Sequence, residues 1–325
     1  MTDYHIVASR PGGPEVLVRE EITVGAPGPR QVRLRHTAVG VNFVDTYFRT
    51  GLYPGPSPAP LGGEAAGVVE AVGAQVSEFR PGDRVAYGTG GQGAYASARL
   101  IAAEHLVHLP DGLSDETAAA VMLKGMTAAY LIGPCGKITE DMTVLVHSAA
   151  GGVGSILVQW LVATGVRVIA HVGTPGKAAR VAAMSPDHVL TCGFDMLAEE
   201  VKALTDGAGV AVVLDGVGKA SWTASLASVA TRGLLVTYGN ASGAVPSFTA
   251  LDLVDAGSVF VTRPTLRDYA ASGAERQALV APLFTMIAGG QIGIEIGQRF
   301  ALDKAADAHR ALEARETIGS TILLP

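Results

Sequence analysis

A turn rich in small residues follows an apolar segment near the middle of the chain, and its spacing suits phosphate binding. The segment reads VLVHSAAGGVGSILVQWL, in which Ala149, Gly151 and Gly154 take the glycine places of a G-x-G-x-x-G fingerprint. The turn must be tight, the second position must let a pyrophosphate approach the backbone, and the third must let helix pack against strand. We expect the strand to end at Ser148 and the helix to begin near Ser155. The spacing therefore predicts dinucleotide binding at the start of that helix.

The residues after this fingerprint favour a dinucleotide that carries a 2′-phosphate. An NAD site usually places Asp or Glu about 20 residues further on, where it binds the ribose hydroxyls. Neither residue occurs here between Ser155 and Pro186, and the second strand ends in HVGTPGK, with Lys177 and then Arg180. A cation after small residues suits a phosphate, so the sequence predicts NADPH. The alternative for Lys177 is a solvated lysine at the start of a helix.

A nicotinamide dinucleotide passes hydride to an acceptor such as a carbonyl, whose oxygen then needs a hydrogen-bond donor for its developing charge. The stretch NFVDTYFRTGLY offers three candidate donors. They are Asn42, Tyr47 and Tyr53, of which Tyr47 is the first choice to orient nicotinamide or to donate to the acceptor's oxygen. Each could equally be a packing or turn residue. No tyrosine has a lysine four places on, the pair that short-chain dehydrogenases use. A quinone or enone spreads the incoming charge by conjugation, so one or two donors, each worth roughly 3 kcal/mol, would suffice.

Three other ionisable residues lie in apolar surroundings. Glu64 interrupts the small and apolar stretch PLGGEAAGVVEAVG, where a lone carboxylate is costly unless it is paired. We expect it to have a structural role, bound to backbone or to a basic residue. His147 and His171 fall on predicted buried strands, and we interpret both as core residues rather than catalytic acids.

Composition limits the classes of partner. The 325 residues are 48% hydrophobic and 17% charged, with a formal net charge of -6 and no cluster of five or more Lys and Arg. Nucleic acids and anionic membranes are therefore poor candidates. The N-terminus lacks the pattern of a secretory signal, and no uninterrupted apolar run reaches about 18 residues. Two cysteines, Cys135 and Cys192, form neither a disulfide framework nor a metal cluster. We expect a soluble cytoplasmic protein.

The order of predicted elements indicates two domains of different kind. The first 120 residues read as short strands broken by Gly and Pro, among them QVRLRHTAVGV, EAAGVVEAVG and GDRVAYG. From about Ser114, helices alternate with strands that are apolar throughout, which predicts an α/β region with a parallel sheet covered on both faces. Two helices near the C-terminus precede the short strand GSTILLP, and this last strand predicts a return of the chain to the first domain.

Four stretches of the chain resemble motifs of the medium-chain dehydrogenase/reductase superfamily and occur in the same order. They are GGEAAGVVEAVG, GDRV, LKGMTAAY and SAAGGVG. Within it, the chain most resembles the zinc-free, zeta-crystallin-like quinone oxidoreductases, through GVNFVDTYFRTGLYP, YGNASGA, VTRPTL and LEARETIGS. Zinc-dependent members carry a histidine where this chain has Gly63 and a cysteine where it has Asn42, and their four-cysteine cluster is missing here. The resemblance therefore implies a site without metal.

The resemblance also implies an architecture. A GroES-like β-rich catalytic domain would span residues 1–122 and 265–325, and a doubly wound Rossmann domain would span residues 123–264. NADPH would bind in the cleft between these domains. The family is usually homodimeric, and SVFVTRP is predicted as the last strand of the nucleotide-binding sheet, where an apolar edge would pair with its twin in a second copy.

Carried over position by position, the resemblance assigns the cofactor contacts to short segments spread along the chain. They are Phe43, Val44, Asp45, Thr46, Tyr47, Tyr130, Gly152, Val153, Gly173, Thr174, Pro175, Gly176, Lys177, Val217, Ala241, Ser242, Gly243, Ala244, Pro264, Thr265, Leu266 and Arg315. The fingerprint adds Ala149, Gly151 and Gly154 to the predicted cofactor-binding residues, and Cys192 falls at one further contact position. Cys192 departs from the bacterial relatives, which place a tyrosine against the 2′-phosphate. We therefore expect a narrower preference for NADPH over NADH, held by Lys177 and Arg315.

The leading functional hypothesis is NADPH-dependent, metal-free reduction of quinones by hydride or electron transfer. A reductase of α,β-unsaturated carbonyls is the alternative, since the same hydride path serves both substrate classes. A third hypothesis, of another class, is a structural protein that binds NADPH without turnover.

Overall fold

The computed structural model describes residues 2–325, and its internal contacts divide the chain into two compact units. The first unit comprises the residues up to Met126 together with Ser272–Phe284 and Ile294–Pro325. The second unit comprises Thr127–Ala271 and Thr285–Gly293. These divisions fall a few residues beyond the predicted domain boundaries and transfer one short C-terminal segment to the second unit.

The first unit is built mainly from strands, arranged in two sheets. A three-stranded antiparallel sheet has the order β2-β1-β4, and a seven-stranded sheet has the order β15-β16-β3-β5-β6-β8, with β7 paired to β3. Their bounds are β1 Asp3–Ala8, β2 Leu17–Ile22, β3 Gln31–Val41, β4 Ala59–Pro60, β5 Ala65–Val72, β6 Arg84–Tyr87, β7 Ala98–Ala102, β8 Val107–His108, β15 Ile296–Ala301 and β16 Ser320–Leu324.

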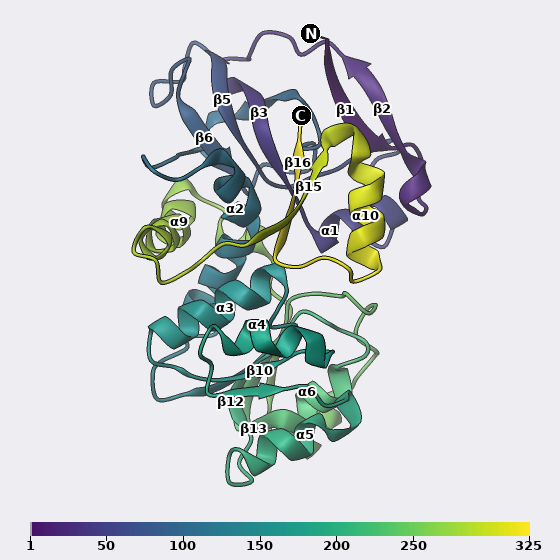
Figure 1. Cartoon of the computed structure of the whole chain (residues 1–325), viewed down its shortest axis with the longest axis vertical. Helices are drawn as coiled ribbons and strands as arrows, with labels where there is room; N and C mark the ends of the chain where they lie inside the picture. Colours follow the sequence, from purple (N-terminus) through teal and green to yellow (C-terminus); the bar gives the residue numbers. More distant parts are fainter. Residues whose placement is uncertain (1) are drawn as a thin grey trace. The chain divides into compact units, whose positions relative to one another are not determined.

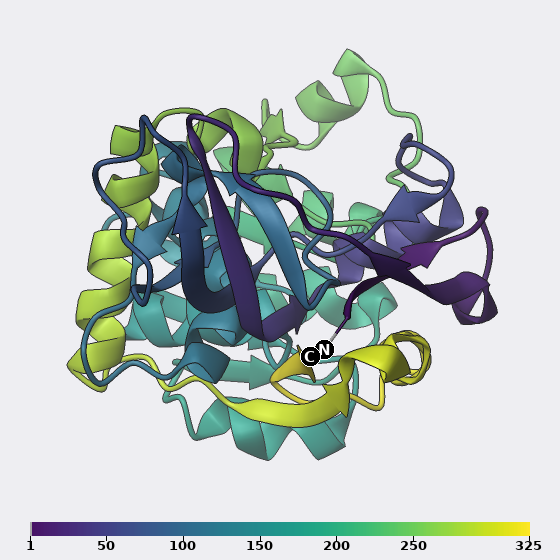
Figure 2. The ribbon, with the colours of Figure 1, turned by 90° about the horizontal axis from the view of Figure 1, so that it is seen from above.

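Alternation along β3 shows why this segment forms a half-buried strand. Val32 and Leu34 are fully buried in the core of the first unit, whereas Arg33 and Arg35 on the opposite face form ion pairs with Asp3. At its other end β3 pairs antiparallel with β16, so the last strand of the chain lies beside an early one (Figures 1 and 2). The predicted return of the chain is confirmed.

Helices α1 Phe43–Thr50 and α10 Ala305–Glu313 belong to this unit, whereas α2 Asp115–Tyr130 and α9 Gly273–Ala288 begin in it and end in the second unit. Helix α1 begins where the backbone N–H of Asn42 donates to Asp45 Oδ2 at 2.8 Å, and it ends at Gly51, whose φ is 81°. Helix α2 continues through one π-helical turn at Leu131–Cys135. The combined helix is long and apolar enough to cross a membrane, but 67% of its most apolar window is buried inside the structure, as in a core helix.

The second unit is a parallel sheet of six strands in the order β11-β10-β9-β12-β13-β14. Helices α3 and α4 lie on one side of this sheet and α5 and α6 on the other (Figure 1). This doubly wound α/β arrangement is the predicted one. The bounds are β9 Thr143–Val146, β10 Arg167–His171, β11 His188–Leu190, β12 Val210–Asp215, β13 Val229–Thr237, β14 Phe260–Thr262, α3 Gly152–Ala163, α4 Ala178–Ala182, α5 Phe194–Ala203, α6 Trp222–Ser228, α7 Ala250–Asp255 and α8 Leu266–Tyr269.

Two predicted boundaries at the glycine-rich turn are wrong. Strand β9 ends at Val146 rather than at Ser148, and helix α3 begins at Gly152 rather than near Ser155. Glycine has low helix propensity, which made the first helical turn read as loop. Gly154 is nevertheless required inside the helix, because a Cβ there would collide with the carbonyl oxygen of Ser148.

Candidate functional site

The turn between β9 and α3 has a fixed, tight conformation. Ser148 adopts a φ of 51°, in the left-handed region, and its carbonyl accepts the N–H of Gly151 at 2.8 Å. Ala149 is fully buried and its N–H donates to the carbonyl of His171 at 3.1 Å, which ties the turn to the end of β10. The chain order also reverses here, because β9 lies between β10 and β12, and ligands of doubly wound sheets bind at such a switch point.

The start of helix α3 offers donors for an anion. The first N–H groups of a helix lack partners within it and carry its positive dipole end. Here they belong to Gly152, Val153 and Gly154, and the first two are only half-buried. Backbone donors that a side chain does not obstruct suit the phosphates of a dinucleotide.

The loop after β10 leaves open space beside this turn. A Cβ at Gly173 or Gly176 would have no atom within 4 Å, and the loop between them is exposed. Lys177 ends a short 3-10 helix that begins at Pro175, and no carboxylate closes the strand. Small residues followed by a cation fit a 2′-phosphate better than a ribose hydroxyl.

The other predicted cofactor residues of the second unit follow neighbouring strands. Val217 follows β12, Ala241–Ala244 follow β13, and Pro264–Leu266 follow β14. Thr237, at the end of β13, has a buried hydroxyl without a hydrogen-bond partner, an unsatisfied polar atom at this same edge. The structure thus brings these residues to the carboxyl ends of parallel strands.

Tyr130 and Cys192 have partners within the second unit. The Tyr130 ring stacks on the ring of Tyr269, with centroids 4.8 Å apart. Cys192 is half-buried, its carbonyl accepts from His171 Nε2 at 3.0 Å, and burial raises the pKa of its thiol. A thiol is a weaker hydrogen-bond donor than the phenol that relatives place here, so this position offers a phosphate little.

In the first unit, Glu64 is fully buried and accepts three hydrogen bonds. Its Oε1 accepts from Lys124 Nζ at 2.5 Å and from Asn42 Nδ2 at 2.8 Å, and its Oε2 accepts from the backbone N–H of Leu123 at 2.6 Å. A Cβ at Gly40 would collide with this carboxylate. The predicted pairing with backbone or a basic residue is confirmed, and Glu64 has both. The sequence did not indicate that Lys124 is the basic residue or that Asn42 is a further donor.

A second buried carboxylate, Asp45, lies next to this cluster. Its Oδ2 accepts from Asn42 N–H and from Tyr95 OH at 3.0 Å, while its Oδ1 has no partner. Burial raises the pKa of Asp45 to about 7. Tyr95 OH also meets His309 Nε2 at 2.9 Å, and His309 Nδ1 lies 3.0 Å from Nη1 of the buried Arg49. Asp45 acts as a helix cap, with its side chain turned into the core.

The aromatic candidates lie together on and after α1. Tyr47 is 7% exposed and its ring meets that of the half-buried Tyr53 edge to face at 5.2 Å. Phe43 is half-buried with its ring centroid 6.0 Å from that of Tyr47, whereas Thr46 is buried. Arg315 is exposed and follows α10 with a φ of 60°. The structure therefore joins Asn42, Tyr47 and Tyr53 in one segment of the first unit.

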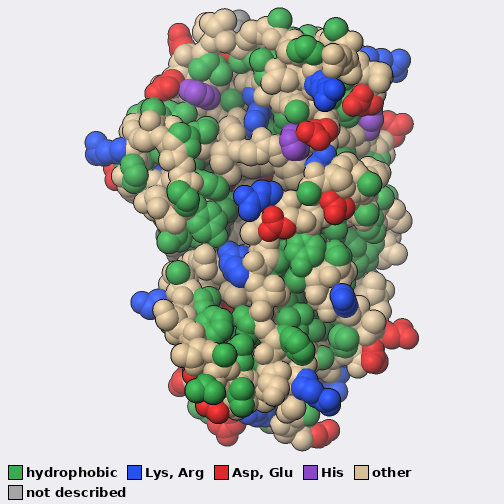
Figure 3. Space-filling view, turned by 180° about the vertical axis from the view of Figure 1, so that it is seen from behind, with side chains coloured by type: hydrophobic (Ala, Val, Ile, Leu, Met, Phe, Trp, Pro, Cys, Tyr) green, Lys and Arg blue, Asp and Glu red, His purple; other side chains and the backbone are tan. Residues whose placement is uncertain are grey.

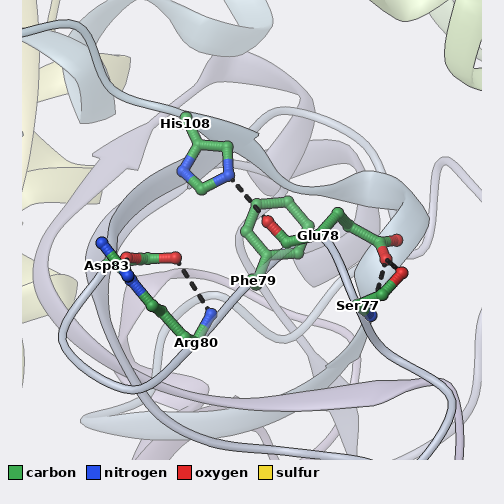
Figure 4. Close-up of a pocket in the computed structure, with 6 residues that line it drawn as sticks. All are labelled: Ser77, Glu78, Phe79, Arg80, Asp83 and His108. Atoms are coloured by element: carbon green, nitrogen blue, oxygen red, sulfur yellow. Dashed lines mark hydrogen bonds and ion pairs between the residues drawn. The ribbon is translucent and has the colours of Figure 1, made fainter.

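Two further observations concern other kinds of site. Among residues 2–325, no group of three or more His, Cys, Asp and Glu side chains is arranged to hold a metal ion. A pocket of about 350 Å³ on the first unit is lined by residues 77–80, Asp83 and His108 (Figure 4). Its polar groups already pair with one another: His108 Nε2 meets the Glu78 carbonyl at 2.9 Å, and Arg80 pairs with Asp83.

The surface in Figure 3 carries Lys, Arg, Asp and Glu side chains of both signs, scattered across that face rather than gathered into a basic patch. This distribution agrees with the small negative net charge and does not favour a polyanionic partner.

Comparison with known proteins gives consistent results. Residues 28–111 match the alcohol dehydrogenase GroES-like domain, and residues 152–283 match the domain described as zinc-binding dehydrogenase. The chain is 50% identical to a quinone oxidoreductase of Pseudomonas aeruginosa over 97% of each chain, and 42% identical to a 2-haloacrylate reductase of Burkholderia over 98% of each. The structure of Escherichia coli quinone oxidoreductase complexed with NADPH superposes with a TM-score of 0.96, at 41% identity, over 99% of this chain and 100% of that one.

Proposed function

Because the chain belongs to the quinone oxidoreductase family of the medium-chain dehydrogenase/reductase superfamily, we propose that it is an enzyme that reduces quinones with NADPH. The observation that carries the proposal is the turn at Ser148–Gly154 together with the end of β10. This turn is shaped for a pyrophosphate, and the strand beside it lacks the carboxylate that an NAD site uses.

The residues present fit NADPH. The N-terminus of α3 would hold the pyrophosphate, and the open loop from Gly173 to Lys177 would receive the adenosine 2′-phosphate. Lys177 and Arg315 are the proposed partners of that phosphate, and arginine suits the role through its paired N–H donors. When bound, NADPH supplies the hydride for reduction of the acceptor.

The chain's own part in the chemistry is to hold the acceptor and to stabilise charge on its oxygen. We place this role on Tyr47 first, with Tyr53 and Asn42 as further donors. One N–H of the Asn42 side-chain amide donates to Glu64, so the second N–H is the one that can donate to the oxygen of the substrate. A quinone gains a hydride and a proton to become a hydroquinone, and a phenol is a suitable hydrogen-bond donor to its oxygen.

The donor set favours a reaction without metal. Gly63 has no ligating side chain, and Glu64 is committed to an ammonium, an amide and a backbone N–H. Full activity after exhaustive chelation, with no stoichiometric zinc by elemental analysis, is the expected result. Loss of activity on chelation that returns with added zinc would overturn this part of the proposal.

A specific observation supports a second candidate, reduction of α,β-unsaturated carbonyls. The similar Burkholderia protein is a 2-haloacrylate reductase, and a 2-haloacrylate is an α,β-unsaturated carboxylate. Steady-state oxidation of NADPH with 1,4-benzoquinone, methyl vinyl ketone and 2-chloroacrylate separates the two. We expect the highest kcat/KM for the quinone; a higher value for either of the others would favour the second candidate.

The same experiment tests the third hypothesis, an NADPH-binding protein without turnover. If NADPH binds in a fluorescence titration and none of the three acceptors oxidises it, the enzymatic proposal fails. If NADPH does not bind at all, the proposal about the cofactor fails as well.

We also propose a homodimer, acting in the cytoplasm. Strand β14 forms one edge of the second-unit sheet, as predicted for SVFVTRP, and its Phe260 is 65% exposed. Leu251 and Val254 on α7 are 71% and 60% exposed, so the apolar side chains near this edge would gain from burial in a second copy. Light scattering at micromolar concentration should give the mass of a dimer, and a monomer would contradict the proposal.

A further inference from the structure

A chain of buried side chains lies directly behind the nucleotide turn, and the mechanism above does not use it. His147 follows β9, His171 ends β10, Asp215 ends β12, and Ser225 lies on α6. Their exposed fractions are between 0% and 3%. The four residues come from elements far apart in sequence, and together they connect three strand ends with one helix.

Four contacts join this chain from end to end. His171 Nε2 lies 3.0 Å from the carbonyl oxygen of Cys192, and the Nδ1 atoms of His171 and His147 are 3.4 Å apart. His147 Nε2 lies 2.9 Å from Ser225 Oγ, and Ser225 Oγ lies 2.7 Å from Asp215 Oδ2.

Counting hydrogens fixes the direction of each bond. Ser225 has one hydroxyl hydrogen and donates it to the Asp215 carboxylate, so His147 Nε2–H must donate to Ser225. His171 must likewise donate its Nε2–H to the Cys192 carbonyl. A neutral imidazole has a single N–H, so the two Nδ1 atoms face each other without a hydrogen, in agreement with theirs being the longest contact. Burial lowers the pKa of His147 to about 4 and also lowers that of His171, which keeps both rings neutral at neutral pH.

This direction excludes a hydrolytic role for the three residue types. A nucleophilic serine donates its hydrogen to histidine, which in turn is oriented by the carboxylate. Here Ser225 donates to Asp215, and its hydroxyl is fully buried. The arrangement therefore serves to hold elements in place.

The elements that it holds are the loops assigned to the cofactor. His147 leads into the turn at Ser148, and His171 leads into the loop that contains Lys177. Asp215 Oδ1 accepts the N–H groups of Val217 at 2.7 Å and Gly218 at 3.2 Å.

The chain also reaches the loop after β13. The Val217 carbonyl accepts both the N–H and the hydroxyl of Ser242, each at 2.8 Å. One network thus fixes the loops after β9, β10 and β12 directly, and the loop after β13 through Val217.

We propose that the His171–His147–Ser225–Asp215 chain is a positioning network that sets the affinity of the second unit for the dinucleotide. It does so by holding the phosphate turn and its neighbouring loops in the binding arrangement in the free protein, so that less ordering accompanies binding. The inference rests on the proposed function, because the ligand concerned is NADPH.

The test compares two serines of the same helix. In Ser225→Ala the bonds to His147 and Asp215 are lost. In the matched control Ser228→Ala a buried hydroxyl is also lost, but Ser228 Oγ donates only to the Ala224 carbonyl, one turn back on α6. Ser221→Ala is a second test variant, since Ser221 Oγ donates to Asp215 Oδ2 at 2.6 Å.

Three measurements are made on each full-length variant. The Kd for NADPH, from nicotinamide fluorescence, should rise about tenfold in Ser225→Ala, because the loops then have to be ordered when NADPH binds. It should stay within twofold of wild type in Ser228→Ala. With the preferred acceptor and saturating NADPH, kcat should be unchanged in Ser225→Ala, because a positioning defect raises KM whereas a misfolded fraction lowers kcat. Hydrogen exchange in the free protein should accelerate at the Val217 and Gly218 amides in Ser225→Ala and not in Ser228→Ala.

The outcomes separate this inference from the proposed function. If wild type binds NADPH and the two alanine variants at Ser225 and Ser221 bind it as tightly as Ser228→Ala does, the positioning network is refuted while the function stands. If wild type does not bind NADPH, the proposed function itself fails. Equal acceleration of exchange in all three variants would indicate a general loss of packing and would also refute the inference.

Discussion

The two units each bury a carboxylate at the centre of a polar cluster, but they stabilise its charge in different ways. In the first unit, Glu64 contacts the ammonium of Lys124 at 2.5 Å in addition to two N–H donors. In the second unit, Asp215 is held by the hydroxyls of Ser221 and Ser225 and by two backbone N–H groups. One carboxylate has a counter-ion beside it, and the other has four hydrogen bonds from donors without a formal charge.

This difference predicts how each unit responds to substitution of a residue that contacts its buried carboxylate. Removing one partner of a buried ion pair strongly destabilises the fold, because the other charge is left without compensation. A carboxylate that shares its charge among several donors keeps most of its stabilisation when one donor is lost. We therefore expect large stability effects at Glu64 and Lys124, and smaller effects, expressed mainly in ligand affinity, around Asp215.

The largest expected effect follows from Lys124→Met. This change leaves Glu64 buried without its cation and should lower the free energy of unfolding by about 3–5 kcal/mol. The measurement is urea denaturation at neutral pH. Combining it with Glu64→Gln should recover more than half of the loss, because the uncompensated charge is then gone. A loss below about 1 kcal/mol in the single variant, the size of a surface pair, would contradict the comparison.

The next effect concerns Asp45, whose pKa is raised by burial to about 7 from 3.8. Between these values the folded state holds a proton that the unfolded state has released, so this residue's contribution falls as pH rises from about 4 to about 7. Asp45→Asn removes that titration while keeping an oxygen to accept from Asn42 and Tyr95. The free energy of unfolding of the variant minus that of wild type should therefore rise by a few kcal/mol from pH 4 to pH 8. A constant difference across this range would show that Asp45 does not titrate there.

Histidines in both units give a dependence of the opposite sign. Burial lowers the pKa of His36 and His147 to about 4 and that of His309 to about 3. The unfolded chain takes up protons near pH 6.5 while the folded chain stays neutral, so stability is lost as pH falls from about 6.5 through 4. Each histidine contributes on the order of 3 kcal/mol.

Denaturation of Asp45→Asn as a function of pH isolates this effect, because the opposing titration is gone. Its free energy of unfolding should fall steeply below about pH 6. Replacing the exposed His108 with Gln is the control and should not remove this fall. A flat curve down to pH 4 would mean that the three buried rings accept protons in the folded state.

The smallest predicted effect concerns cofactor choice. Lys177→Ala and Arg315→Ala should each weaken NADPH binding about tenfold, the size of one charge-assisted hydrogen bond, and leave NADH nearly unchanged. Fluorescence titration with both cofactors measures this, and the exposed Lys202→Ala on α5 is the control. Equal losses for both cofactors would assign these residues to the pyrophosphate or to the fold.

Much of the fold could be predicted from periodicity, because strands such as β3 alternate and strands such as β9 are apolar throughout. Helix and strand boundaries were harder to predict where glycine can belong either to a turn or to a closely packed helix. Gly152 and Gly154 read as a turn, yet they belong to the first turn of α3, where close packing on Ser148 requires glycine. Local sequence does not report that contact.

Site prediction was limited by distance along the chain. Glu64 stands out in its apolar stretch, but its partner Lys124 is 60 residues away on α2, and only the fold joins them. Asp215 gives a similar signal, because it is a carboxylate at the end of the buried strand VAVVLD, but it is not among the predicted site residues. Ser221 and Ser225 carry no signal of their own, since serines on a helix are common and their role depends on the strand ends behind them.

The central proposal, quinone reduction by NADPH, is tested most directly by product stoichiometry. Under anaerobic conditions the protein is mixed with NADPH and an excess of 1,4-benzoquinone, and both NADPH loss and hydroquinone formation are followed. We predict one hydroquinone for each NADPH consumed. The amount of NADPH consumed should exceed the amount of enzyme many times over, and a chelator should not change the rate. Binding of NADPH without its consumption, by this quinone or by an enone, would contradict the account.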